Sequence, residues 1–223
     1  MNRLIMKHGT VVTAVILAIF AWVVWSRIHR GGVGAVAVLG VTAVAVWVLG
    51  TVTFVYLWPR ITVGGFKRTL RGRGLGGGPI PVNTVYAVPE SPSESAAAGN
   101  VIATGTDDLV YLAGWVDVRG GPQLLHVPEV GGRYYSVQLT DPTSGANVAY
   151  VGTRATGSAA GTFLLCAPAW QGAAPPQTTR IDLPHRAALI IGRVFVADDA
   201  DRPAAYALAR QIELAPLVNR PEA

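Results

Sequence analysis

The chain has 223 residues, of which 51% are hydrophobic and only 14% are charged, and its formal net charge is +5. The charge is unevenly distributed: the first 78 residues carry nine Lys or Arg and no acidic residue, whereas the remaining 145 carry nine Arg and thirteen Asp or Glu. Basic proteins often bind nucleic acid through phosphate contacts. Here the basic residues flank apolar segments and the remainder is acidic, so we do not expect a nucleic-acid partner.

Two uncharged apolar segments, residues 9–26 and 31–59, lie within the basic part. Each is long enough to cross a bilayer as a helix. Only a short Arg- and Gly-containing connection separates them, so we predict a transmembrane hairpin in residues 1–59, with helices at about 10–26 and 33–58. Pro59 is expected to end the second helix. The lipid bilayer is therefore the first predicted partner.

The charge distribution predicts the orientation of this hairpin. Seven Lys or Arg flank its two ends and only two Arg lie in its turn. The positive-inside rule then places both ends, and the domain that follows, in the cytoplasm. Neither segment contains an ionisable residue, which favours an anchor over a channel. The small residues Thr10, Ala14 and Ala18 form a stripe that either packs within the hairpin or supports a homo-oligomer.

Residues 60–79 are rich in Gly and Arg and predict a flexible basic linker at the membrane surface. Its cations favour anionic lipid headgroups, and they are Arg60, Lys67, Arg68, Arg71 and Arg73. Gly72, Gly74 and Gly77 have the spacing of a dinucleotide-binding loop. That motif requires a preceding buried strand and a following helix, which the sequence does not provide, so we predict no nucleotide cofactor.

Residues 80–217 alternate short β-like segments with Gly/Pro turns and predict one mainly-β domain, an antiparallel β-sandwich of jelly-roll type. The predicted strands are 82–88, 108–118, 124–127, 134–140, 147–152, 162–167, 179–183 and 187–197. One helix is expected from about residue 201 to 211, with Asp201 as N-cap and Pro203 in the first turn. Residues 218–223 are predicted to form a tail.

Several ordered blocks of this domain resemble the bacterial family known as domain of unknown function 1254. The blocks include residues 108–118, Gly131-Gly132-Arg133-Tyr134-Tyr135, Gly152-Thr153-Arg154, residues 167–172, Ile191-Gly192-Arg193 and residues 214–217. Together they extend over roughly residues 80–217. The resemblance implies a β-sandwich of jelly-roll type, in agreement with the number of predicted strands.

The chain departs from the family pattern at two points. Relatives usually have Asn, preceded by Pro, where this chain has Gly105 and Thr106, which puts any site built on that Asn in doubt. Many relatives also continue into a second domain, of unknown function 1214. The resemblance therefore implies a companion-domain protein as a partner. Several relatives are exported, which makes an extracytoplasmic domain the alternative to the cytoplasmic orientation.

No catalytic motif is evident in the domain. His126, Glu129 and His185 are too few and too separated for the three or four ligands of a metal site, so no metal is predicted. Cys166 lies in an apolar segment and is expected to be a buried thiol. The serines have no recognisable nucleophile motif, although a triad can assemble from distant residues. An enzyme, in particular a hydrolase working alone or with a companion subunit, therefore remains the alternative to a binding protein.

The candidate binding residues are arginines within the family-like blocks. Arg133, Arg154 and Arg193 each lie at the edge of a predicted strand. They either hold strand ends through salt bridges with Asp117, Asp141 or Asp182, or converge on an anionic small molecule, because guanidinium groups suit carboxylates and phosphates. The predicted ligand site consists of Asp108, Tyr111, Arg133, Tyr134, Arg154 and Arg193. We therefore predict a membrane-anchored β-domain that binds a small ligand or a protein partner.

Overall fold

The computed structural model describes residues 2–75, 77–89 and 105–217. The predicted tail at 218–223 lies outside these residues, and so do the side chains of Thr10 and Ala14 of the small-residue stripe. The chain divides into two units, Met1–Tyr56 and Leu57–Ala223.

The first unit consists of most of a long helix, α1 (Asn2–Gly72). Large apolar side chains cover it on all sides and are exposed, among them Val41, Trp47 and Phe54. A helix that is apolar all round suits lipid. Among the described residues, one helical segment, Ala37–Gly72, is long and apolar enough to cross a membrane. The helical assignment continues through residues 27–32, where the sequence predicted a turn between two helices.

The expectation that Pro59 ends the helix is wrong, because α1 continues past it to Gly72. A proline inside a helix removes one backbone hydrogen bond and usually kinks or breaks it. Here the following turns are also stabilised by packing on the β-domain, since Val63 and Leu70 are buried in one cluster with Trp115. Residues 60–72 are therefore helical and docked, where the sequence predicted a flexible linker.

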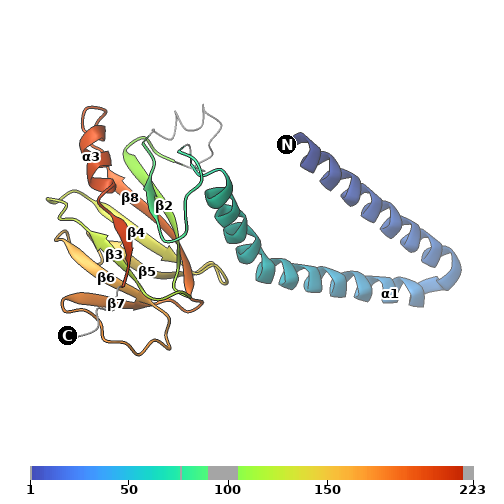
Figure 1. Cartoon of the computed structure of the whole chain (residues 1–223). Helices are drawn as coiled ribbons and strands as arrows, with labels where there is room; N and C mark the ends of the chain where they lie inside the picture. The colour runs from blue at the N-terminus through green and yellow to red at the C-terminus, as the bar shows by residue number, and fades with distance from the viewer. Residues whose placement is uncertain (1, 76, 90–104, 218–223) are drawn as a thin grey trace. The chain divides into compact units, whose positions relative to one another are not determined.

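The second unit contains the end of α1, from Leu57 to Gly72, and a mainly-β domain of two sheets (Figure 1). One sheet has the order β1-β2-β8-β4-β5 and is antiparallel throughout. The other has the order β7-β6-β3-β9, and its β6–β7 pair is parallel, so this sheet is mixed and the expectation of purely antiparallel pairing is corrected. The strands are β1 (Val85–Ala87), β2 (Leu109–Asp117), β3 (Gln123–Val127), β4 (Tyr135–Thr140), β5 (Asn147–Gly152), β6 (Gly161–Cys166), β7 (Thr178–Asp182), β8 (Ala187–Phe195) and β9 (Glu213–Pro216).

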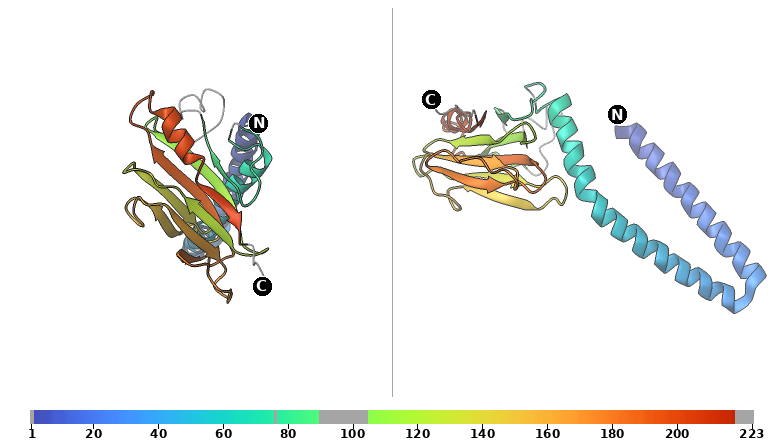
Figure 2. Two further views of the ribbon diagram at one scale, coloured as in Figure 1. Left: turned by 60° about the vertical axis from the view of Figure 1, so that its left-hand side comes forward. Right: turned by 60° about the horizontal axis from the view of Figure 1, so that its bottom comes forward.

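The main core lies between the two sheets, which are layered face to face (Figure 2). Alternate residues of each strand point inward, as the period of two in a strand requires. On β2, Val110, Leu112 and Val116 belong to this core, and Leu125 of β3 and Leu165 of β6 face them from the other sheet. The predicted strands are thus confirmed, since each overlaps a strand of the structure, although β3, β6 and β7 begin one residue earlier than predicted.

A short helix, α3 (Arg202–Ala209), packs against β2 and β8 and contributes Ala205 and Ala209 to the core. It confirms the predicted C-terminal helix. Asp201 occupies its N-cap position but forms no capping hydrogen bond, because its carboxylate binds elsewhere. The strand after α3, β9, was not predicted.

The outer face of the five-stranded sheet is divided between two environments. On β2 and β8, the outward-facing Ala113, Trp115 and Leu189 are covered by the second apolar cluster, which includes Val63 and Leu70 of α1. Toward β4 and β5 the same face carries polar and aromatic side chains. The cluster leaves the β4–β5 half of this face uncovered, and Tyr111 of β2 packs against the cluster.

Candidate functional site

One row of side chains crosses the outer face of the five-stranded sheet. Tyr111 of β2 is the register partner of Arg193 of β8, which is in turn the partner of Ser136 of β4, and Ser136 is the partner of Gly152 of β5. Residues directly opposite each other in antiparallel strands place their side chains on one face. The fold therefore brings together two of the predicted site residues, Tyr111 and Arg193, although they are 82 positions apart in the sequence.

A cavity of about 300 Å³ lies beside this row, at the β4–β5 end of the sheet. Arg154 lies over the ring of Tyr134, with 5.7 Å between its guanidinium carbon and the ring centroid. This distance is in the range of a cation–π interaction. The cavity is lined by Tyr134, Tyr135, Ser136, Tyr150, Gly152, Arg154 and Ala155. Tyr134 and Arg154, both predicted, are therefore part of one hollow.

Gly152 lines this cavity at the point where β5 lies closest to β4. A Cβ atom at this position would lie 2.5 Å from the carbonyl oxygen of Tyr135 and 2.8 Å from the Cα of Ser136, so only glycine allows β5 to lie this close to β4. Thr153 follows and holds the strand ends together, because its hydroxyl accepts a hydrogen bond from the Tyr135 amide at 3.1 Å and donates one to the Arg133 carbonyl at 3.2 Å.

Polar side chains continue along the same face. Gln138 donates hydrogen bonds to Thr140 at 2.9 Å and to Asn147 at 2.8 Å, and Asn147 donates to the hydroxyl of Tyr150. This network fixes the Tyr150 side chain at the rim of the cavity. Ser136 and Tyr150 were not among the predicted site residues. Their alternation within strands 134–140 and 147–152 was the available signal, because it places them on the face opposite the core.

Arg133 is directed to a different partner. Its guanidinium forms a two-point ion pair with Asp201, with N–O distances of 2.5 and 2.6 Å, and also donates to the carbonyl of Phe195 at 2.6 Å. The ion pair and a hydrogen bond from the Ala197 amide hold the pKa of Asp201 well below its ordinary value. Arg133 therefore acts as a brace between the start of β4 and the start of α3.

Asp108 is exposed just before β2, and its backbone carbonyl accepts a hydrogen bond from the Val196 amide at 2.8 Å. The structure does not place it in the cavity with Tyr134 and Arg154. Thr106, which stands where relatives usually have Asn, donates its backbone amide to the Tyr111 hydroxyl at 3.1 Å. This position therefore still contacts the candidate site, but through its backbone.

The three aspartates that the sequence offered as partners for the candidate arginines are bound to other groups. Asp117 pairs with Arg119, Asp182 pairs with Arg180 at 2.9 Å, and Asp141 contacts His185 at 2.8 Å. In the described part of the chain, neither Arg154 nor Arg193 forms an ion pair. The site therefore presents two cations on one face with no carboxylate bound to either.

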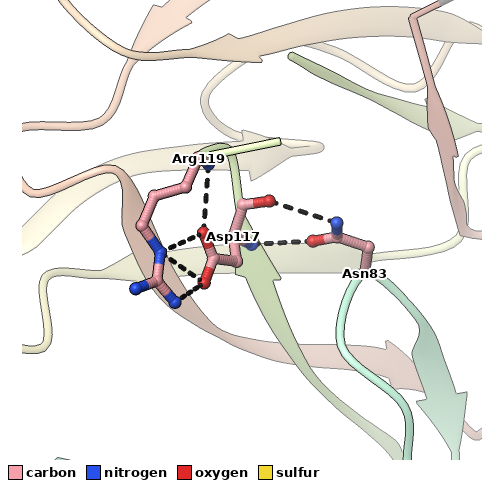
Figure 3. A network of polar contacts seen from close by, with 3 residues as sticks. All are labelled: Asn83, Asp117 and Arg119. Carbon is pink, nitrogen blue, oxygen red and sulfur yellow. Dashed lines mark hydrogen bonds and ion pairs between the residues drawn. The ribbon is translucent and has the colours of Figure 1, made fainter. Parts of the chain in front are cut away.

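The Asp117–Arg119 pair belongs to a compact network at the far end of β2 (Figure 3). Arg119 contacts both carboxylate oxygens of Asp117, while Asn83 hydrogen-bonds to the Asp117 backbone. Hydrogen bonds from the Arg119 side chain are the main reason that the pKa of Asp117 lies below its ordinary value. This network is internally satisfied and fixes the edge of the sheet.

Ser144, Asp141 and His185 are in contact, and no other contact of this kind is found in the described residues. Their arrangement is not that of a catalytic triad. Asp141 lies between the other two, because one carboxylate oxygen is 2.8 Å from His185 Nδ1 and the other accepts from the Ser144 hydroxyl at 2.5 Å. A triad needs the imidazole between the nucleophile and the acid. Burial alone would raise the pKa of Asp141, but hydrogen bonds from Ser144, Thr143 and His185 outweigh it and lower this pKa. The group is a turn brace.

The described residues also contain no cluster of metal ligands, and their one cysteine is buried. Within residues 2–75, 77–89 and 105–217, no three His, Cys, Asp or Glu side chains converge as metal ligands. Cys166 is fully buried, and burial, followed by a hydrogen bond to Asp182, raises the pKa of its thiol to about 11. Such a thiol stays protonated at neutral pH.

The solved structures that resemble this chain include two bacterial proteins. The VPA0106 protein of Vibrio parahaemolyticus is 21% identical, with a TM-score of 0.57, over 74% of this chain and 37% of that one. An uncharacterised protein of Burkholderia cenocepacia is 17% identical, with a TM-score of 0.35, over 52% of this chain and 32% of that one. This chain thus covers about a third of each. The first likeness supports the fold. No curated protein matches the chain significantly.

The family comparison extends over almost the whole β-domain. Residues 82–216 match the family described as "Protein of unknown function (DUF1254)". These residues include both sheets, α3 and every residue of the outer-face row. The resemblance inferred from the sequence blocks is therefore confirmed, and the chain belongs to the DUF1254 family.

Proposed function

We propose that this protein is a membrane-anchored β-domain that binds a small anionic ligand on the outer face of its five-stranded sheet. The observation that carries the proposal is the pair of arginines, Arg154 and Arg193, on a face where neither is bound to a carboxylate in the described residues. Guanidinium groups bind carboxylate and phosphate groups through paired hydrogen bonds. A site with this chemistry favours an anion over a neutral compound.

The shape of the site supports the same ligand class. The cavity of about 300 Å³ is at the lower end of the usual range for small-molecule sites. Tyr134 and Tyr150 provide aromatic walls, and the Ser136 hydroxyl adds a hydrogen-bonding group next to Arg193. A small carboxylate or phosphate with an apolar part fits this combination of cations, aromatic rings and one hydroxyl.

The test is a ligand screen on the full chain in a neutral detergent. Small carboxylates and organic phosphates are expected to raise the unfolding temperature, and neutral analogues are not. Arg154→Gln and Arg193→Gln should abolish the shift while folding normally, whereas Arg210→Gln, which removes a charge that does not line this cavity, should keep it. The proposal fails if no acidic compound binds, or if all three variants respond alike.

A protein partner is the second candidate, favoured by the exposure of large side chains on this face. Tyr134, Tyr150 and Phe195 are 37%, 47% and 40% exposed, and Tyr, Phe and Arg are enriched at interfaces. The partner that the family resemblance implies is a companion-domain protein. Crosslinking from Phe195→Cys in cells should then capture one defined partner, while the same crosslinker at exposed Ala174→Cys should not. An enzymatic role has no comparable support among the described groups.

We also propose that α1 anchors the protein in the membrane, that residues 1–59 form a hairpin and that the β-domain is cytoplasmic. The exposed apolar surface of α1 and the seven-to-two charge imbalance support these inferences. In a Cys166→Ser background, Ala174→Cys should resist an impermeant thiol reagent in intact cells and react after lysis. Labelling in intact cells would instead favour the extracytoplasmic alternative, and removal of the N-terminus before labelling would favour a signal sequence.

A further inference from the structure

The end of α1 carries a second, independent hollow. It has a volume of about 570 Å³ and is lined by Gly64, Lys67, Arg68, Arg71 and Gly72. We name it the basic cleft. Three of its five residues are cations, and residues 1–78 contain no acidic side chain. We propose that the basic cleft binds the phosphate headgroup of an anionic phospholipid.

The three cations act together because of their spacing. Arg68 and Arg71 are three positions apart and Lys67 and Arg71 are four apart, so all three side chains lie on neighbouring parts of one helix surface. Gly64 and Gly72 lie above and below them, and a Cβ atom at either glycine would contact nothing within 4 Å. Glycine at both ends therefore leaves open a space that larger residues would fill.

The arginines are not needed to satisfy the end of the helix. Last-turn carbonyls are often bound by basic side chains. Here the Thr69 carbonyl accepts from the Arg73 and Gly74 amides at 2.9 Å, and the Leu70 carbonyl accepts from the Ile80 amide at 2.9 Å. Arg68 and Arg71 are exposed, and neither forms a hydrogen bond or ion pair within the described residues. Their guanidinium groups are thus available to an added anion.

Lys67 is held in a fixed position by the β-domain. Its ammonium nitrogen lies 4.3 Å from the centroid of the Trp115 ring, and Trp115 is buried in the cluster that docks α1. Lys67 is itself half-buried. The cleft is therefore partly pre-organised, since one of its three cations belongs to the packed interface between helix and sheet.

The position along α1 selects a lipid as the source of the phosphate. Ile61 is 62% exposed and is the last large apolar side chain exposed on the helix. Gly64 follows three residues later, about 4.5 Å along the helix axis at 1.5 Å per residue. An anchored helix then places the cleft at the headgroup layer, where cations attract anionic lipid.

The experiment uses the two lysines of the chain, Lys7 and Lys67, as probe and internal reference. The full chain is reconstituted into lipid nanodiscs of phosphatidylcholine alone or with a third of phosphatidylglycerol, and labelled with an uncharged amine reagent. We expect phosphatidylglycerol to slow labelling of Lys67 about fivefold and labelling of Lys7 less than twofold, as measured by peptide mass spectrometry. Equal slowing of both lysines, or none, would overturn the proposal.

Single variants separate the cleft from the general surface charge. Arg68→Gln and Arg71→Gln should each remove most of the Lys67 protection, whereas Arg73→Gln, which removes an equal charge outside the cleft, should preserve it. A loss of protection in Arg73→Gln as large as in Arg71→Gln would show only diffuse attraction and contradict the proposal. Glycerol phosphate added to phosphatidylcholine discs should not protect Lys67, and protection there would assign the cleft to a soluble anion instead.

This inference rests on the proposed membrane anchor but not on the proposed outer-face ligand. If the chain fails to co-purify with the nanodiscs, the anchor is wrong and the headgroup site fails with it. If it co-purifies and Lys67 is unprotected, only the headgroup site fails. Arg154→Gln should leave the Lys67 protection unchanged, because Arg154 belongs to the outer-face cavity.

Discussion

The side-chain amide of Asn83 holds the backbone of Asp117 with two hydrogen bonds, donating to its carbonyl at 3.1 Å and accepting from its amide at 2.7 Å (Figure 3). The backbone amide of Asn83 also donates to the Trp115 carbonyl at 2.8 Å. Asn83 thereby extends the pairing with β2 to a point before Val85, the first residue of β1. It does so with a positive φ of 61°, a conformation that Asn tolerates better than most residues.

We expect Asn83→Ala to destabilise the β-domain by about 1–3 kcal/mol, because it removes both hydrogen bonds and places Ala in a left-handed conformation. Asn83→Gly loses the same bonds without the backbone strain and should cost less. Denaturant unfolding of the full chain in detergent measures both. Equal stability of the Ala variant and the unsubstituted protein would show that the two bonds contribute nothing.

Leu70→Ala tests whether the end of α1 is docked on the sheet. Leu70 is 1% exposed and packs in the cluster that contains Trp115, so its truncation should cost about 2–5 kcal/mol of local packing. Trypsin cleavage after Arg68 and Arg71 should be slow in the unsubstituted protein and at least tenfold faster in the variant. Ile61→Ala, at an exposed position, is the control. Fast cleavage in all three proteins would instead support the prediction that residues 60–79 form a flexible linker.

The strands of the β-domain were predictable because their alternation is local. The helical structure of residues 60–72 was not predictable, because Pro59 and the glycines of 60–79 indicate a linker. The helix is stabilised by a tertiary contact, the burial of Leu70 against Trp115, which no local pattern contains. β9 was missed because four residues containing a proline give no periodic signal. It forms because β3 offers it an edge.

The sequence predicted which residues belong to the candidate site, but it did not predict how they are arranged in space. The pairing of Tyr111 with Arg193 depends on the register of β2 and β8, which no local pattern contains. Arg133 was grouped with the other arginines by its place beside a strand. Its partner Asp201 is 68 positions away, and Asp201 was itself assigned to a helix cap.

Gly152→Ala should disrupt the floor of the outer-face cavity. The added methyl would meet backbone atoms of Tyr135 and Ser136 at 2.5 and 2.8 Å, and a backbone cannot move aside as a side chain can. We expect a loss of about 1–3 kcal/mol in unfolding free energy, typical of overpacking, together with loss of ligand binding. Gly120→Ala, where a Cβ atom has no neighbour within 4 Å, should be nearly neutral. A stable Gly152→Ala variant would indicate that the two strands separate easily.

Asp201→Asn should change how stability depends on pH. In the folded protein Arg133 and the Ala197 amide lower the pKa of Asp201 below its model-compound value of 3.8. As pH falls below about 4, the unfolded chain therefore binds the proton first, and stability is lost. The variant should be less stable at pH 7 and should lose less stability between pH 5 and pH 3. Asp199→Asn, at an exposed neighbouring position, is the control, and identical pH profiles for the two variants would contradict the role of the ion pair.

Cys166 should be unreactive in the folded protein. Its Sγ donates to an Asp182 carboxylate oxygen at 3.3 Å, it has no exposed surface, and its pKa of about 11 leaves almost no thiolate at pH 8. Thiolate is the reactive form, so a neutral thiol reagent should label Cys166 only when the domain opens. An exposed Ala174→Cys in the same chain should react at least a hundredfold faster, and both thiols should react at similar rates in denaturant. Comparable rates under native conditions would mean that the sandwich opens around β6 and β7, where the parallel pair would be its weakest part.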